Sequence, residues 1–140
     1  PGNEVYTMNF DGTDIKKVYT IPDGLSDSLY TDENYVYIST LNYDKSGENI
    51  TGTSLYVYDH SFNLLNTAKL PLPDPLVYYS NDILSSVGDK LIAYNTTFEL
   101  DENGEIKDED HPIYYIKYID KKDLLKKDAD LQWKTAFESE

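Results

Sequence analysis

The chain has 140 residues, a length typical of one domain, and carries 26 acidic against 12 basic residues, for a formal net charge of −14. This charge repels phosphate backbones and anionic lipid headgroups, so binding to nucleic acid or to a membrane surface is disfavoured. No apolar run approaches the roughly 20 residues that a membrane-spanning helix needs, so we expect a soluble segment without membrane insertion. Cysteine is absent, which excludes disulfides and thiol catalysis.

Short runs rich in tyrosine and β-branched residues follow one another along the chain, separated by turn-forming Asp, Asn, Gly and Ser. Tight turns are expected at 11–13, at His60-Ser61 and at Asn103-Gly104. Residues 121–131 fit a turn of helix or a strand equally well. The pattern predicts an all-β fold of antiparallel hairpins, with strands at 5–10, 15–20, 35–41, 54–58, 63–70, 90–97 and 113–119.

Several of these strands are apolar on both faces. In residues 35–39, Tyr35 and Tyr37 lie on one side of the strand, and Val36 and Ile38 lie on the other. A sheet that is apolar on both faces must be covered on both. Small stacked sheets, such as the blades of a β-propeller, satisfy this requirement better than the inner sheet of a sandwich does.

The strands also repeat weakly, in units of about 50 to 60 residues that hold four strands, which is the size of a propeller blade. The segment 5–9 aligns with 55–59, the segment 33–37 with 88–92, and Tyr58-Asp59 with Ile119-Asp120, at offsets of 50, 55 and 61.

The first 40 residues carry a family resemblance. The segment 5–13 resembles a strand and turn of six-bladed propellers of the TolB-like and low-density-lipoprotein-receptor (YWTD-like) types, and Tyr37-Ile38-Ser39-Thr40 takes the place of the Tyr-Trp-Thr-Asp signature, without its Trp and Asp. The resemblance implies antiparallel four-stranded blades, about two and a half to three of them in an incomplete ring. We expect residues 1–140 to form one domain of a larger propeller whose remaining blades are its partners. The alternative is a set of ordinary hairpins from an unrelated sheet protein.

No arrangement typical of catalysis is visible. The two histidines, His60 and His111, fall in expected loops, and there is no Gly-x-Ser-x-Gly element. Six carboxylates gather between Asp101 and Asp110, but Gly104 lies at the fourth position and not at the sixth, as a calcium loop requires. We therefore predict no catalytic residue, no cofactor and no metal ligand, and interpret the acidic run as a solvated hairpin tip while leaving calcium open.

Tyr78 and Tyr79 are the candidate ligand-binding residues. They follow the proline-rich segment 71–75, which would hold them stiffly, and tyrosine offers a flat, half-polar contact surface. Packing in a strand is the competing interpretation for both residues.

The sequence thus favours a non-catalytic module that binds a protein or a glycan. The alternative function is a propeller scaffold for a hydrolase or lyase whose catalytic residues lie outside this segment, and a purely structural spacer is a third. The lysine-only basic residues and the Tyr-, Asn- and Ile-rich composition suggest a bacterial protein. We expect it outside the cell or at the cell surface, where a lipid anchor on a removed N-terminal segment could hold it.

Overall fold

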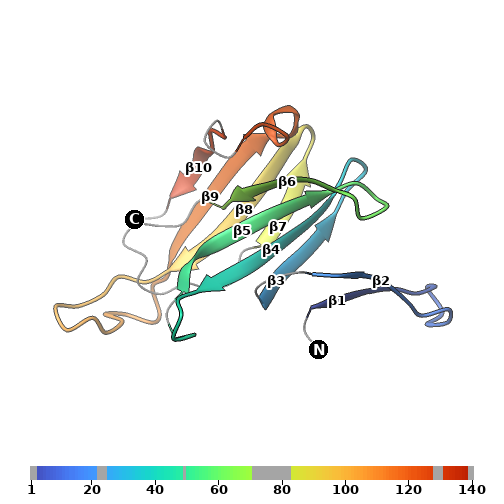
Figure 1. Ribbon diagram of the computed structural model, residues 1–140. Coiled ribbons are helices and arrows are strands. Elements are labelled where there is room, and N and C mark those ends of the chain that lie inside the picture. Colours follow the sequence, from blue (N-terminus) through green and yellow to red (C-terminus); the bar gives the residue numbers. More distant parts are fainter. Residues whose placement is uncertain (1–2, 22–24, 49, 71–82, 128–130, 139–140) are drawn as a thin grey trace.

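A computed structural model describes residues 3–21, 25–48, 50–70, 83–127 and 131–138. These residues form three antiparallel sheets, with the orders β1-β2, β3-β4-β5-β6 and β10-β9-β8-β7 (Figure 1). The all-β prediction is confirmed, and so are the antiparallel four-stranded sheets. The elements are β1 Glu4–Thr7, β2 Lys16–Thr20, β3 Leu25–Thr31, β4 Val36–Tyr43, β5 Ile50–Tyr58, β6 Leu64–Lys69, β7 Ile83–Val87, β8 Lys90–Thr97, β9 Ile113–Asp120, the 3₁₀ turn η1 Lys121–Asp123 and β10 Lys134–Glu138.

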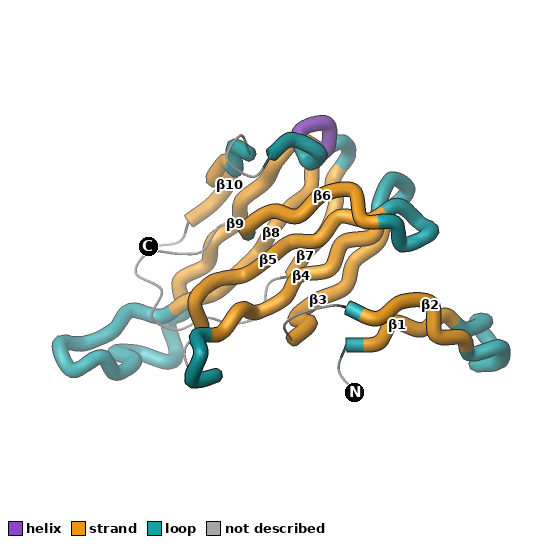
Figure 2. Tube along the Cα trace, viewed as in Figure 1, coloured by secondary structure: helices purple, strands orange, loops and turns teal. Residues whose placement is uncertain are grey.

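One face of the sheet β3–β6, here called the central sheet, packs against the sheet β7–β10, here called the outer sheet (Figures 1 and 2). On its other face, the start of β4 and the end of β5 pack against residues of the hairpin β1–β2, which lies at one end of the sheet. The core toward the outer sheet consists of Tyr37, Leu55, Val57, Leu70, Leu84, Leu91, Ala93, Ile119 and Leu124. The core toward the hairpin consists of Ile21, Val36, Ile38 and Tyr58, with Val5, Tyr19, Tyr56 and Phe62 packed against it.

The two four-stranded sheets repeat each other in register. Val36 pairs with Tyr58 in the central sheet, and Leu91 pairs with Ile119 in the outer sheet. Val36 and Leu91 are 55 residues apart, and Tyr58 and Ile119 are 61 residues apart, which are two of the offsets of the sequence repeat. The weak sequence repeat therefore corresponds to structurally equivalent positions, because the two residues that pair in the central sheet have repeat counterparts that pair with each other in the outer sheet.

Strands at the edges of the sheets were harder to predict than those in the middle. The sequence analysis missed the edge strands β3, β7 and β10, although it predicted the edge strands β1, β2 and β6. The missed strand β3 reads Leu-Ser-Asp-Ser-Leu-Tyr-Thr and so lacks the apolar run that marks the middle strands. The segment 121–131 begins with η1, and its residues 128–130 lie outside the described ones.

Three turns share one hydrogen-bond pattern and lie where the sequence predicted turns. They span residues 9–13, 59–63 and 101–105. In each turn the first backbone N–H donates to the carbonyl of the fifth residue, at 2.8 to 3.0 Å, and the fourth N–H donates to the carbonyl of the first, at 2.9 to 3.1 Å. The strand β1 ends at Thr7, earlier than predicted, because residues 9–13 belong to the first of these turns.

The fourth residue of each turn has a positive φ. Gly12 and Gly104 adopt φ angles of 83° and 80°, which cause no steric strain because glycine has no Cβ. Phe62, which has a Cβ, adopts a φ of 60°. Phe62 tolerates this conformation because its ring stacks on Tyr19, with the ring centroids 5.4 Å apart, and lies 6.0 Å from the ring of Tyr58. Aromatic packing on the core thus offsets the backbone strain at this one position.

Replacing Gly12 with valine should destabilise the protein by about 1 kcal/mol or more, because a β-branched residue is strained at positive φ. A Cβ at Gly12 would meet no heavy atom within 4 Å, so backbone strain is the only cost. Gly12→Asn is the matched control, since asparagine tolerates this region of φ. Thermal unfolding measures both variants, and a Gly12→Val melt identical to that of the wild type would show that the turn is wrongly assigned.

Candidate functional site

The predicted ligand-binding pair, Tyr78 and Tyr79, lies outside the described residues. Its role therefore stays a prediction. The described residues offer two hollows and one buried polar cluster as candidate sites, and none of the three was predicted from the sequence as a site.

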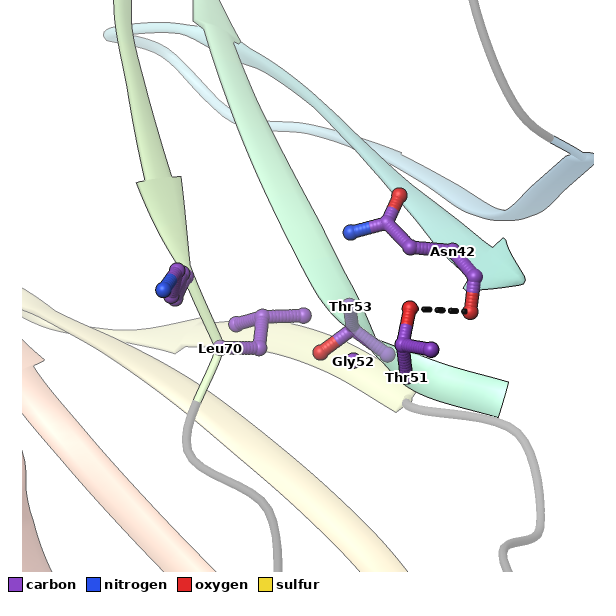
Figure 3. A pocket seen from close by; sticks show the side chains of 6 residues that line it. Asn42, Thr51, Gly52, Thr53 and Leu70 are labelled. Atoms are coloured by element: carbon purple, nitrogen blue, oxygen red, sulfur yellow. Dashed lines mark hydrogen bonds between the residues drawn. The ribbon is translucent and has the colours of Figure 1, made fainter. Parts of the chain in front are cut away.

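The first hollow lies at the end of the central sheet where β6 stops. Its volume is about 370 Å³, and β5 continues past the last residue pair that it forms with β6, Ser54 with Lys69. Figure 3 shows its lining side chains, which come from the ends of three neighbouring strands and from the residue after β6. They belong to Asn42, Thr51, Gly52, Thr53, Lys69 and Leu70.

Polar groups of this hollow are partly occupied by one another. The Thr51 hydroxyl donates to the backbone carbonyl of Asn42 at 3.2 Å (Figure 3). The side-chain Nδ2 of Asn42 donates to Ser54 Oγ at 2.9 Å. Thr53 is only 2% exposed, and its Oγ1 has no hydrogen-bond partner among the described residues. A buried hydroxyl without a partner is costly in a folded protein, so Thr53 is the unusual group of this site.

The second hollow, of about 440 Å³, lies beside the acidic hairpin tip. Its charged side chains pair among themselves: Lys107 Nζ lies 2.8 Å from Glu99 Oε1, and His111 Nδ1 lies 2.6 Å from Asp108 Oδ2. The hydrogen bond from His111 lowers the pKa of Asp108 below its usual value. All four side chains are more than half exposed, so solvent screens these pairs.

The acidic run between residues 101 and 110 is used for turn formation. The Asp101 carboxylate accepts the backbone N–H groups of Asn103 and Glu105, at 2.8 and 3.0 Å. The bonds from Glu105 and then Asn103 lower the pKa of Asp101. Across the described ranges, no three His or acidic side chains are grouped as a metal site would require.

A buried polar cluster joins the central sheet to the outer sheet. Asp32, in the β3–β4 turn, forms an ion pair with Lys121 of η1, with Oδ2 and Nζ 3.0 Å apart and side-chain exposures of 4% and 8%. Asp32 Oδ2 also accepts the hydroxyls of Tyr37 and Ser86, at 2.9 and 2.6 Å.

The other carboxylate oxygen of Asp32 is occupied as well, because Oδ1 accepts the backbone N–H groups of Asn34 and Tyr35, at 2.8 and 2.9 Å. Burial alone would raise the pKa of Asp32, but the hydrogen bonds from Ser86, Tyr35 and Lys121 outweigh it and hold this pKa far below its usual range. A carboxylate with five donors has no lone pair left for a substrate. We therefore interpret this cluster as a structural clamp between the sheets.

Both histidines lie in exposed loops, as predicted. His60 also has a structural contact that the sequence did not suggest, since its Nε2 lies 2.8 Å from the backbone carbonyl of Asp32. A carbonyl only accepts hydrogen bonds, so Nε2 carries the proton in this contact. His60 thus supports the turn that holds the clamp.

No family model matches the chain, and no significant match was found among curated proteins or solved structures. The resemblance to TolB-like and YWTD-like propellers therefore remains a prediction from the sequence. Within the part of the chain that the structure describes, no helix has the length and apolar character needed to span a bilayer.

Proposed function

We propose that this chain is a segment of a β-propeller that acts as a non-catalytic interaction module, outside or on the surface of a bacterial cell. In this proposal the central and outer sheets are two consecutive blades, and the hairpin β1–β2 is the last half of the preceding one. The function is recognition of a protein or glycan by the loops and strand ends of the blades.

The observation that carries the proposal is the register repeat between the two four-stranded sheets. Val36 with Tyr58 and Leu91 with Ile119 occupy equivalent places in consecutive sheets that pack face to face. Successive sheets with one register and apolar contact faces are the arrangement of radially repeated blades.

The face of the outer sheet that points away from the central sheet, which no other described strand covers, supports further blades. Under the same offsets, the positions of Tyr37, Leu55 and Val57, which pack toward the outer sheet, fall on Ile92, Ile116 and Tyr118. These three residues share the opposite face of the outer sheet and are only half-buried. A next blade placed there would cover them as the outer sheet covers the central one.

The clamp around Asp32 supports a role without catalysis in this segment. Its ion pair between Asp32 and Lys121 is the least exposed of those found among the described residues, and it joins two sheets. Catalytic groups are held in contact with a cleft instead.

An array of glycans and peptides, probed with the full protein, tests the interaction role. We expect selective binding of at least one member, and Tyr78→Ala and Tyr79→Ala test whether the predicted tyrosine pair contributes. Unchanged binding by both variants would remove that pair from the binding surface. Absence of binding to every array member, together with hydrolysis or elimination of any of them, would contradict an interaction module and favour a catalytic scaffold.

A further inference from the structure

We propose that the open edge of β1 is a strand-addition site, and that a β-hairpin of the same polypeptide, preceding β1, occupies it. The occupant pairs with β1 in the register in which β4 pairs with β5. This inference rests on the proposed division of the chain into blades, in which the hairpin β1–β2 is incomplete. It adds the edge that is filled, the register, and the chemistry of the strand that fills it.

The first argument is that the hairpin β1–β2 repeats the hairpin β5–β6. Both hairpins close with the same pair of backbone hydrogen bonds in their turns. Behind the turns, Thr7 pairs with Lys16 as Val57 pairs with Asn66. Thr7 and Val57 are separated by 50 residues, which is one of the offsets of the sequence repeat.

The far ends of the two hairpins match as well. Ile21 donates its backbone N–H to the carbonyl of Asn3 at 2.7 Å, and Leu70 donates to the carbonyl of Thr53 at 3.4 Å. Ile21 and Leu70 are both buried. One extra residue in β2 is taken up by the register shift after Val5, so the two ends stay aligned. The strand β1 therefore corresponds to β5 along its whole length.

The second argument is the difference in neighbours. β5 lies between β4 and β6, whereas β1 has only β2 beside it among the described strands (Figure 1). An edge strand offers unpaired backbone N–H and C=O groups to another strand. The open side of β1 corresponds to the side of β5 on which β4 lies. Since β4 comes directly before β5 in the chain, the equivalent strand comes before β1.

The third argument is the exposure of an apolar side chain next to this edge. Met8, which holds the place of Tyr58, is 68% exposed, whereas Tyr58 is 0% exposed. β4 supplies Val36 and Ile38 to the cluster in which Tyr58 is buried. A strand with apolar residues in those two places would cover Met8 in the same way.

The repeat also fixes the chemistry of the occupant. In the central sheet Ile38 lies opposite Tyr56, whose place in β1 is held by Tyr6. The occupant is therefore an extended segment with one apolar residue opposite Tyr6 and another, two positions earlier, opposite Met8. Its backbone pairs with β1, as in other cases where a strand is added to a sheet edge.

The chain supplies a test segment, because residues 25–52 contain β3, β4 and the start of β5. A second copy of this segment, fused directly to Asn3, places a copy of β4 before β1 with the natural spacing, since Gly52 precedes Thr53 in the chain. We expect the backbone amides of residues 5–7 to exchange with solvent at least about tenfold more slowly than in the wild type. Hydrogen exchange followed by NMR measures this.

Met8 provides a second readout, because it is the only methionine of the chain and the added copy contains none. Dilute hydrogen peroxide converts an exposed methionine to its sulfoxide, and mass spectrometry gives the rate. We expect Met8 to oxidise several-fold more slowly in the fusion than in the wild type. The matched control is the same fusion with Ile38→Pro in the copy, because proline cannot donate to the strand ladder. Its Met8 should oxidise at the rate of the wild type.

Equal exchange and equal Met8 oxidation in the fusion and the wild type would overturn the strand-addition site. If the fusion does not fold, residues 25–48 added to the wild type as a free peptide replace it. Saturable slowing of exchange at residues 5–7 then supports the site, and its absence overturns it. A wild type that sediments as a dimer, with residues 5–7 already protected, would overturn the proposed source, because a second copy would then fill the edge.

Failure of this inference is distinguishable from failure of the interaction role. Exchange and oxidation report on the edge of β1 with no ligand present, whereas the glycan and peptide array reports on ligand recognition. Selective array binding by a protein whose β1 stays unprotected in the fusion would overturn the strand-addition site and leave the interaction role standing.

Discussion

Asp32→Asn should lower the free energy of unfolding by about 3–5 kcal/mol, because it leaves the ammonium group of Lys121 buried without its counter-ion. The two side chains are 4% and 8% exposed, so water cannot replace the lost carboxylate. Urea unfolding at neutral pH measures the change. The double variant Asp32→Asn, Lys121→Met removes both charges and should recover a large part of the loss.

The surface pair Lys17 and Glu4 provides the matched control. Its atoms lie 3.0 Å apart, as in the clamp, but the side chains are 51% and 35% exposed. Lys17→Met should therefore change stability little. An Asp32→Asn protein as stable as Lys17→Met would show that the clamp does not join the sheets. If Asp32→Asn does not fold, recovery in the double variant still tests the ion pair.

The same clamp also predicts a pH dependence. The pKa of Asp32 is lowered in the folded protein, so its contribution to stability is fully present above the unfolded value of about 3.9. The contribution is lost as the pH falls below that value. The difference in free energy of unfolding between the wild type and Asp32→Asn should thus shrink as the pH falls below about 4, and urea unfolding at a series of pH values measures it.

Leu91→Ala should cost about 2–5 kcal/mol, because it opens a cavity between the central and outer sheets. Leu91 lies on β8, is 0% exposed and belongs to the core that both sheets share. Leu64→Ala is the matched control on β6, since Leu64 is 52% exposed and its truncation opens no cavity. Urea unfolding of both variants gives the comparison. Similar small losses for the two would mean that the sheets do not pack on each other.

The core strands of both four-stranded sheets could be predicted because their own sequences require burial. Runs such as 35–41 and 113–119 carry β-branched and aromatic residues on both faces of the strand. Both faces of such a strand must be buried, which indicates a strand in the middle of a covered sheet. The turns at 9–13 and 101–105 carry glycine where φ is positive, and that signal is also local. The edge strands β3 and β7 lack such runs of apolar residues, so no comparable local signal marks them.

The candidate site could not be predicted in the same way. The hollow exists because β6 ends before β5 does, and strand ends are set by register and neighbouring loops. That the Thr53 hydroxyl lacks a partner depends on atoms from other strands, so its own sequence neighbourhood carries no sign of it. The predicted pair Tyr78 and Tyr79 was chosen for its place after the proline-rich segment 71–75 and for the contact surface of tyrosine, and it lies outside the described residues.

The sequence by itself determined the middle strands of the two four-stranded sheets, the tight turns and the spacing of the repeat, because alternation, turn residues and offsets of 55 and 61 can be read along the chain. Tertiary structure alone decided which faces meet and which charges are buried. Asp32 and Lys121 lie 89 positions apart, and only the packing of two sheets brings them to 3.0 Å. A contact of this kind depends on the whole chain, because Asp32 is buried beside Lys121 only when the two sheets pack together.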